Sequence, residues 1–360
     1  MMPPLARSTR FIAMRFCLPL VLSVWTFGQT CACTIPVFRF ALDRWEADKF
    51  HLILPTSAAE DTSLQDLLRP LRANGVANMD ITTSKDPALT AAELRYSRDS
   101  EQKVWTGNLD KTALERLLDS PARKRILQSI LAGDSFIWVI AESGTHEDAA
   151  EVARIEKRLR FLEQVAALPI QDPNDPDSQL GPGPPLRLKF ATLRVRRDDP
   201  AEAVLLKMLA GPKAGIDPAA TSFAAPVFGK GRVLGAWPLA LLDDATLEDA
   251  SMFLVGRCGC RIKNENPGWD LLLNVDWTKA LAAASAAHTQ EAGVDVPVRA
   301  QAPPPDTTAV VVATPAKPES ATAAPNPPAI PWLPIAAASL LGAAAVLLLR
   351  KPNRPNKNHP

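Results

Sequence analysis

The residues of this chain with the richest chemistry are its cysteines. There are five, of which Cys17 and Cys31 fall in an apolar N-terminal stretch typical of a cleaved export signal. Cleavage would leave Cys33, Cys258 and Cys260. An odd number of thiols in an oxidising compartment leaves at least one that is unpaired, lipidated, bridged to another chain or bound to metal.

The sequence allows three arrangements of these thiols. Cys33 can form a structural disulfide with Cys258 or with Cys260, which would tie the N-terminus to a distant part of the chain. Cys258 and Cys260 can form a strained, readily reduced redox pair if Gly259 bends the chain, because they would lie about 6.6 Å apart on a regular strand. Two or three thiolates can also capture a soft metal ion.

The four histidines argue against hydrolytic and zinc enzymology. His51 falls inside an expected strand, His146 at an expected helix start, His288 in or beside an expected linker and His359 in the C-terminal tail. No two of them have the spacing of a shared zinc site on a helix. A Gly-x-Ser-x-Gly turn for a nucleophilic serine is not present, and Gly229–Gly231 is too short for a phosphate loop. We therefore expect no catalytic residues and no cofactor.

Tryptophan is unusually frequent beside a single tyrosine. Large rings at strand and turn positions usually pack into the core. For Trp269 and Trp277, in the sequences Asn-Pro-Gly-Trp-Asp and Val-Asp-Trp, a binding surface is the alternative. The tryptophans of the expected folded body are Trp45, Trp105, Trp138, Trp237, Trp269 and Trp277.

Both ends of the chain indicate export and membrane anchoring. Residues 1–32 contain three arginines, an apolar run too short to span a bilayer and small residues before Cys33, as in a signal peptide. Residues 332–349 are uncharged, apolar and long enough to cross a bilayer as a helix, and the basic tail 350–360 favours a cytoplasmic C-terminus. We expect a single-pass cell-membrane protein with its body on the periplasmic side. An uncleaved N-terminal anchor and a lipoprotein acylated at Cys33 are the alternatives.

The charge of the expected body argues against a nucleic-acid partner. The chain has 40 basic and 39 acidic residues, but seven of the basic ones stand in the two terminal segments. Taking these seven from 40 leaves 33 basic against 39 acidic residues, or about −6. A nucleic-acid-binding surface needs the opposite excess. The expected partners are therefore the membrane and a membrane protein of the envelope.

Composition divides the expected body into two ordered segments and a stalk. Residues 282–331 are rich in Ala and Pro and hold no aromatic residue, which is typical of a disordered, extended stalk. Residues 169–185, with repeated Asp-Pro and Gly-Pro, interrupt all periodicity. We expect them to link a first α/β domain at 33–168 to a second at 186–281.

Apolar periodicity in each segment predicts alternating strands and helices. The first segment predicts a strand at 50–54 and another at 136–141, a continuous apolar run suited to a central strand. Asp110 and Ser120, the latter followed by Pro121, are expected helix N-caps. The second segment predicts strand, helix, hairpin and helix in that order, which suggests a small α/β sandwich in each half.

The second segment resembles the second half of a thioredoxin-like domain. Its strand at 186–195 and helix at 200–209 precede a hairpin in which Pro226 starts the first strand. The resemblance implies one or two small thioredoxin-like α/β sandwich domains. No Cys-x-x-Cys stands at the start of the helix near Pro200, so the redox chemistry of that family does not carry over.

Two other segments, Cys33–Trp45 and Cys258–Leu273, resemble an uncharacterised family of exported, single-pass membrane-anchored bacterial proteins of planctomycete type. The resemblance covers most of the expected ordered chain. It implies no known activity, but it singles out these two segments as the ones to follow.

Together these patterns predict a non-catalytic, membrane-anchored ectodomain that binds or scaffolds another component of the cell envelope. A proline-rich stalk would give such an ectodomain reach without any enzymatic requirement. The alternative is a thiol-based redox or soft-metal-handling protein in which Cys258 and Cys260 are the working pair.

Overall fold

The computed structural model describes residues 34–96, 102–171, 174–213, 215–258 and 262–291 of the 360-residue chain. The chain divides into two compact units, residues 1–297 and 298–360, and every described residue belongs to the first. The expected signal peptide, transmembrane helix and basic tail lie outside the described residues. Of the helices that are described, none is long and apolar enough to cross a bilayer.

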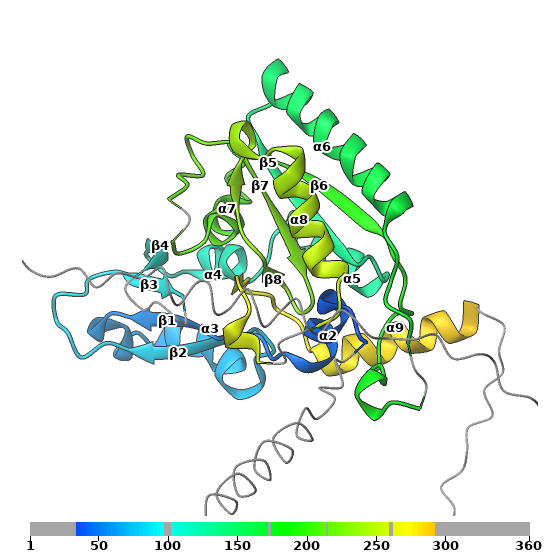
Figure 1. The fold of residues 1–360 in the computed structure, drawn as a ribbon. Helices are drawn as coiled ribbons and strands as arrows, with labels where there is room; N and C mark the ends of the chain where they lie inside the picture. The colour runs from blue at the N-terminus through cyan, green and yellow to red at the C-terminus, as the bar shows by residue number, and fades with distance from the viewer. Residues whose placement is uncertain (1–33, 97–101, 172–173, 214, 259–261, 292–360) are drawn as a thin grey trace, which may run out of the picture. The chain divides into compact units, whose positions relative to one another are not determined.

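The early part of the described chain forms a four-stranded sheet (Figure 1). Its strands are β1 (Phe50–Leu54), β2 (Met79–Thr83), β3 (Ala92–Arg95) and β4 (Lys103–Gly107). Their order is β2-β1-β3-β4, in which β1 is parallel to β2 and antiparallel to β3, and β3 is antiparallel to β4. Helix α3 (Thr62–Asn74) crosses from β1 to β2, and α4 (Lys111–Leu118) follows β4.

The later part forms a six-stranded sheet. Its strands are β5 (Phe136–Glu142), β6 (Phe190–Arg196), β7 (Phe223–Phe228), β8 (Arg232–Val233), β9 (Trp237–Pro238) and β10 (Trp269–Asp270). The order is β10-β8-β7-β5-β6, with β9 paired to β7. The helices of this part are α6 (His146–Val165) between β5 and β6, α7 (Ala203–Ala210) between β6 and β7, and α8 (Asp244–Val255) after β9.

The two sheets repeat one arrangement. In the second, β5 is parallel to β6 and antiparallel to β7, and β7 is antiparallel to β8. The order β6-β5-β7-β8 therefore matches β2-β1-β3-β4 in both sequence and direction. In each case a helix joins the two parallel strands, as the crossover between parallel strands requires. The expected α/β class is confirmed as a mixed α/β fold with two sheets.

The sheets divide the chain at a different place from the expected domain boundary at 169–185. Strand β5 precedes that segment and β6 and β7 follow it, yet β5 pairs with both. A proline-rich stretch between two apolar segments has the same composition whether it links two domains or completes a crossover within one sheet. Here it completes the crossover from α6 to β6.

Strand β5 is buried along its whole length, which confirms the expected central strand. Its two faces belong to two cores, one with Phe136, Trp138 and Ile140 and the other with Ile137, Val139 and Ala141. Apolar residues of α6 and α8, which lie side by side in Figure 1, cover the first face. Residues of α7 and of α5 (Pro121–Leu131) cover the second.

The expected N-caps of two helices are also confirmed. The carboxylate of Asp110 accepts a hydrogen bond of 2.7 Å from the backbone N–H of Ala113 at the start of α4. The hydroxyl of Ser120 accepts one of 3.3 Å from the backbone N–H of Arg123 at the start of α5, with Pro121 in the first turn. Both caps satisfy donors that the helix itself leaves unpaired.

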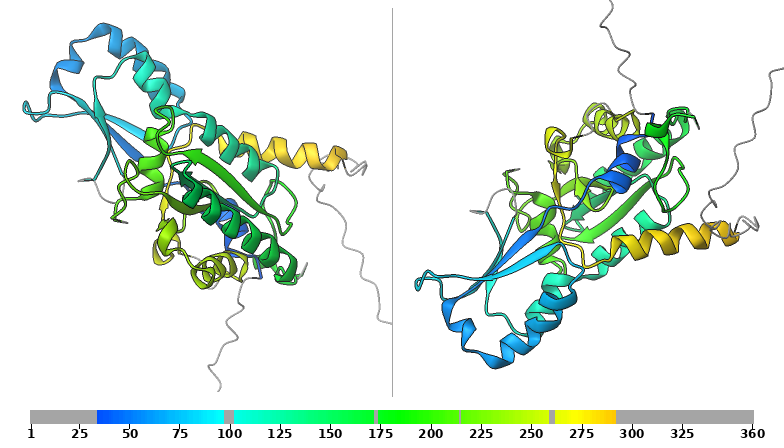
Figure 2. Two further views of the ribbon diagram at one scale, coloured as in Figure 1. Left: turned by 90° about the horizontal axis from the view of Figure 1, so that it is seen from above. Right: turned by 90° about the horizontal axis from the view of Figure 1, so that it is seen from below.

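Helix α9 (Trp277–Glu291) occupies the start of the expected stalk. The sequence composition of 282–331 predicts an extended chain, but 282–291 is helical. Alanine has the highest helix propensity, so a segment too poor in large apolar residues to build a core can still form a helix. Both views of Figure 2 show the far half of α9 standing clear of the sheets. Residues 292–331 lie outside the described residues.

Candidate functional site

The two segments singled out by the sequence lie side by side. Pro36 and Arg257 form an antiparallel bridge. On either side of it, Val37 N–H donates to the carbonyl of Gly256 over 3.0 Å, and Cys258 N–H donates to the carbonyl of Ile35 over 3.1 Å. We define the seam as residues 34–48 and the described residues of 256–278.

The opening side of the seam is helix α2 (Val37–Arg44), most of whose side chains are buried. Arg39 forms an ion pair of 2.9 Å with Asp43, one turn later. The same guanidinium donates to the carbonyls of Gly181, over 2.7 Å, and of Pro184. The end of the 169–185 segment is thereby fixed against the seam. A buried cation is stable only with such partners.

A buried charge cluster forms the middle of the seam. Arg232, which is 2% exposed, pairs with Asp270 over 3.2 Å and lies 5.5 Å from the ring centroid of Trp45. Lys263 pairs with Asp270 and, over 2.9 Å, with Asp48. The guanidinium of Arg232 also donates to the carbonyls of Asn266, Pro267 and Gly268.

This cluster is structural. The hollow beside it measures only about 10 Å³, too little for a ligand. Its cations and carboxylates satisfy one another and connect the 45–48 stretch to the 262–270 loop. Removal of one partner would leave an uncompensated buried charge, which is costly.

Cys258 lies at one end of the seam and is 1% exposed. It packs in the core that also holds Ile35 and Val37. Reactive thiols are usually solvent-accessible, so this degree of burial favours a packing role for Cys258. Cys33 and Cys260 lie outside the described residues. Among the residues that are described, no group of three or more His, Cys, Asp or Glu side chains is placed to hold a metal ion.

The two tryptophans proposed as a binding surface have different environments. The indole N–H of Trp269 donates to the carbonyl of Met208 over 2.8 Å, and its ring lies over Gly211, where a Cβ would come within 2.3 Å of it. Trp269 therefore packs the closing strand against α7. Trp277 begins α9 and is partly buried, and its indole N–H donates to no acceptor among the described residues.

A cavity of about 510 Å³ opens beside Trp277, and that volume is typical of small-molecule sites. It lies next to the charge cluster, since Glu46 and Lys230 contribute to the walls of both hollows. The residues that line it are Asp43, Glu46, Val76, Pro182, Lys230, Val275, Asp276, Trp277, Thr278 and Leu281. Of the two proposed tryptophans, the structure brings only Trp277 to this cavity.

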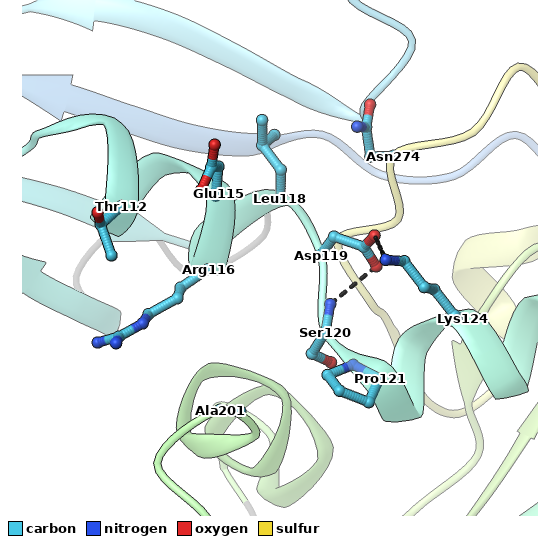
Figure 3. Close-up of a pocket in the computed structure, with 10 residues that line it drawn as sticks. All are labelled: Thr112, Glu115, Arg116, Leu118, Asp119, Ser120, Pro121, Lys124, Ala201 and Asn274. Atoms are coloured by element: carbon cyan, nitrogen blue, oxygen red, sulfur yellow. Dashed lines mark hydrogen bonds and ion pairs between the residues drawn. The ribbon is translucent and has the colours of Figure 1, made fainter.

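A second cavity, of about 490 Å³, lies between α4 and α5 (Figure 3). Asp119 accepts a hydrogen bond of 2.8 Å from Ser120 N–H and pairs with Lys124 over 3.1 Å, and Figure 3 shows Arg116 extending away from this pair. In the same part of α5, burial lowers the pKa of the Arg123 guanidinium to about 10. The negative charges of Asp119 and Glu202 offset part of this shift. This cavity lacks an aromatic platform, so we regard the Trp277 cavity as the stronger candidate.

The histidines occupy the places that the sequence indicates. His51 is partly buried in β1, His146 is exposed as the first residue of α6, and His288 lies in α9. They stand on three separate elements. The described part of the chain therefore brings no pair of histidines together on one element.

A polar network fixes the turn from β5 into α6. The carboxylate of Asp148 accepts hydrogen bonds from the backbone N–H of Ser143, over 2.6 Å, and from the hydroxyls of Ser143 and Ser222, over 2.5 and 2.6 Å. Burial alone would raise the pKa of Asp148, but these hydrogen bonds and the charge of Arg197 outweigh it and hold the pKa below its usual value.

This network makes a pH-dependent prediction. Because the pKa of Asp148 is lower in the folded state, its carboxylate stabilises the fold above about pH 4 and loses that effect as the pH falls through the folded pKa. Ser222→Ala removes one donor and should lower the free energy of unfolding by about 0.5–1.5 kcal/mol at pH 7. The loss should shrink at pH 3, as measured by urea unfolding at both values. An equal loss at both would show that the carboxylate is not involved.

Sequence reasoning missed most walls of the Trp277 cavity. Val76 follows α3, Lys230 lies in the turn between β7 and β8, and Pro182 belongs to the crossover before β6. No local motif connects these positions, because their proximity results from the packing of distant segments. The one sequence feature that pointed to this cavity was Trp277, which follows the segment Cys258–Leu273 in the chain.

Comparison of the chain with protein-family models, with curated proteins and with solved structures gave no match. The geometry of the described residues therefore carries the functional argument.

Proposed function

We propose that this protein is a non-catalytic ectodomain of the cell envelope, exported by its N-terminal signal and held by the apolar segment 332–349 with the basic tail in the cytoplasm. Its work is to bind or scaffold another envelope component, and the site of binding is the Trp277 cavity. The proposal retains the resemblance to exported, membrane-anchored proteins of planctomycete type.

One observation carries this proposal. The two segments singled out by the sequence meet along the seam, and the cavity of about 510 Å³ opens beside them. Lys263 of the buried ion-pair cluster donates to the backbone carbonyl of Glu46, which lines the cavity. A concave surface held by a rigid frame is the arrangement that binding requires.

We further propose that each sheet belongs to a thioredoxin-like unit, two in tandem. The shared order β2-β1-β3-β4 and β6-β5-β7-β8, with a helix between the parallel strands and a hairpin after them, supports this proposal. The sequence contains no Cys-x-x-Cys, so the redox chemistry of that family is not part of the proposal.

Two experiments test the proposed function. A reporter fused after residue 360 should be cytoplasmic, and one inserted near residue 290 should lie outside the cytoplasm; the reverse result would overturn the topology. Crosslinking of full-length protein in intact cells should then capture an envelope component. Deletion of 292–331 should reduce capture, whereas capture of no component by any variant would contradict the scaffolding role.

A thiol-based function is the alternative candidate. The backbone N–H of Cys258 donates to the carbonyl of Ile35, so the segments that carry the three expected thiols are neighbours in the fold. Titration against a dithiol buffer tests it. A Cys258–Cys260 couple that exchanges near the potential of its compartment would support a redox role, and one that stays oxidised far below it would exclude that role. Copper or zinc near one equivalent, lost in Cys260→Ser, would support metal handling instead.

A further inference from the structure

The ionised groups around the Trp277 cavity already have partners of opposite charge. Asp43 pairs with Arg39 over 2.9 Å, and Glu46 with Lys230 over 2.7 Å. Asp276 pairs with Lys279 over 3.2 Å and also accepts from the backbone N–H of Lys279. The carboxylates and their partner cations therefore cancel. A charged ligand would gain little here without displacing an existing ion pair.

Apart from the buried Asp43, these groups keep unused hydrogen-bonding capacity. An ionised carboxylate offers about four lone-pair sites, and an ammonium three donors. The side chain of Glu46 is 87% exposed, so its remaining acceptor sites face solvent. The indole N–H of Trp277 is a donor with no acceptor among the described residues. A ligand that both donates and accepts hydrogen bonds, without carrying charge, suits this set.

Part of the lining of the cavity is apolar. Val76, Val275, Trp277 and Leu281 contribute to it, and Val76 is 45% exposed. An indole is a large, rigid surface on which the flat apolar side of a ligand can stack, while its N–H makes a polar contact at the edge. The lining of the cavity therefore combines an apolar surface with ion-paired groups that can still form hydrogen bonds to a ligand.

We infer that the Trp277 cavity binds a neutral, hydroxyl-rich ring with one apolar face, that is, a sugar unit of an envelope glycan. This inference rests on the proposed binding function and specifies its ligand. Sugar hydroxyls donate to the carboxylates of Glu46 and Asp276 and accept from Lys230 and the indole N–H. The C–H face of the ring lies on Trp277.

The test uses full-length protein in lipid nanodiscs and saturation-transfer NMR. The probes are neutral tetrasaccharides of glucose and of N-acetylglucosamine, the corresponding monosaccharides, and a lysine-rich peptide of similar mass. We expect at least one tetrasaccharide to bind, with an affinity that changes less than twofold between 50 and 300 mM salt, because no net charge is neutralised. Binding of the peptide alone, lost at high salt, would overturn the inference.

Variants locate the binding. Trp277→Ala should weaken the sugar at least tenfold, whereas Trp277→Phe keeps an aromatic face and should weaken it less than fivefold. Leu241→Ala, at an exposed position on another surface, is the matched control and should not change it. Equal binding by wild type and Trp277→Ala would overturn the site. If no sugar binds while wild-type protein still crosslinks its envelope component, the ligand class is wrong and the proposed function stands.

Discussion

Asp270→Asn should lower the free energy of unfolding by about 3–5 kcal/mol. Asp270 is buried and accepts from Arg232, from Lys263 and from the backbone N–H of Asp48. Asparagine keeps the shape but removes the negative charge, so the guanidinium of Arg232 stays buried without its counter-ion. Denaturant unfolding of full-length protein in detergent, followed by tryptophan fluorescence, measures the loss.

The matched control is Asp66→Asn, which makes the same change in an exposed pair with Arg69. Exposed pairs contribute about 0–1 kcal/mol, so this variant should unfold almost as the wild type does. The double variant Arg232→Met, Asp270→Asn should be more stable than Asp270→Asn alone, because both charges leave the interior together. If Asp270→Asn and Asp66→Asn cost the same, the cluster does not stabilise the seam.

Cys260→Ser should lower the stability of the oxidised protein by about 2–5 kcal/mol. Cys33 and Cys260 lie outside the described residues, and the prediction comes from the pairing beside them. Pro36 faces Arg257, and Cys258 donates to Ile35, so each step back along one strand is a step forward along the other. The described pairing ends at Ile35 and Cys258, each of which is two residues along the chain from a cysteine of the expected bridge.

Peptide mapping without reductant measures the pairing directly and should give a Cys33–Cys260 linkage. The control variant is Cys258→Ala, which should keep this linkage because Cys258 packs in the core. With reductant present, wild type and Cys260→Ser should unfold at the same denaturant concentration. A Cys33–Cys258 linkage would contradict the prediction, and an acylated Cys33 would exclude any bridge from it.

Local features of this fold were predictable from the sequence. The capping side chains of Asp110 and Ser120 act on backbone groups a few residues away, so the sequence shows both the donor and the acceptor. The continuous apolar run of β5 likewise indicated burial on both faces. The described parts of the two segments that the resemblance singled out, Cys33–Trp45 and Cys258–Leu273, meet in the seam.

The sequence did not show which strands and segments pack together, because this depends on contacts between residues far apart in the chain. Nothing local to β5 indicates that it pairs with β6 beyond a proline-rich crossover, and the domain boundary was therefore misplaced. Alanine-rich composition did not reveal that 282–291 continues a helix. Likewise Trp269 and Trp277 have similar sequence surroundings, and packing alone gives the first a backbone acceptor and leaves the second beside a cavity. Local interactions such as helix caps can be predicted because they involve residues close together in the sequence. This cavity could not be, because it forms where distant segments pack together.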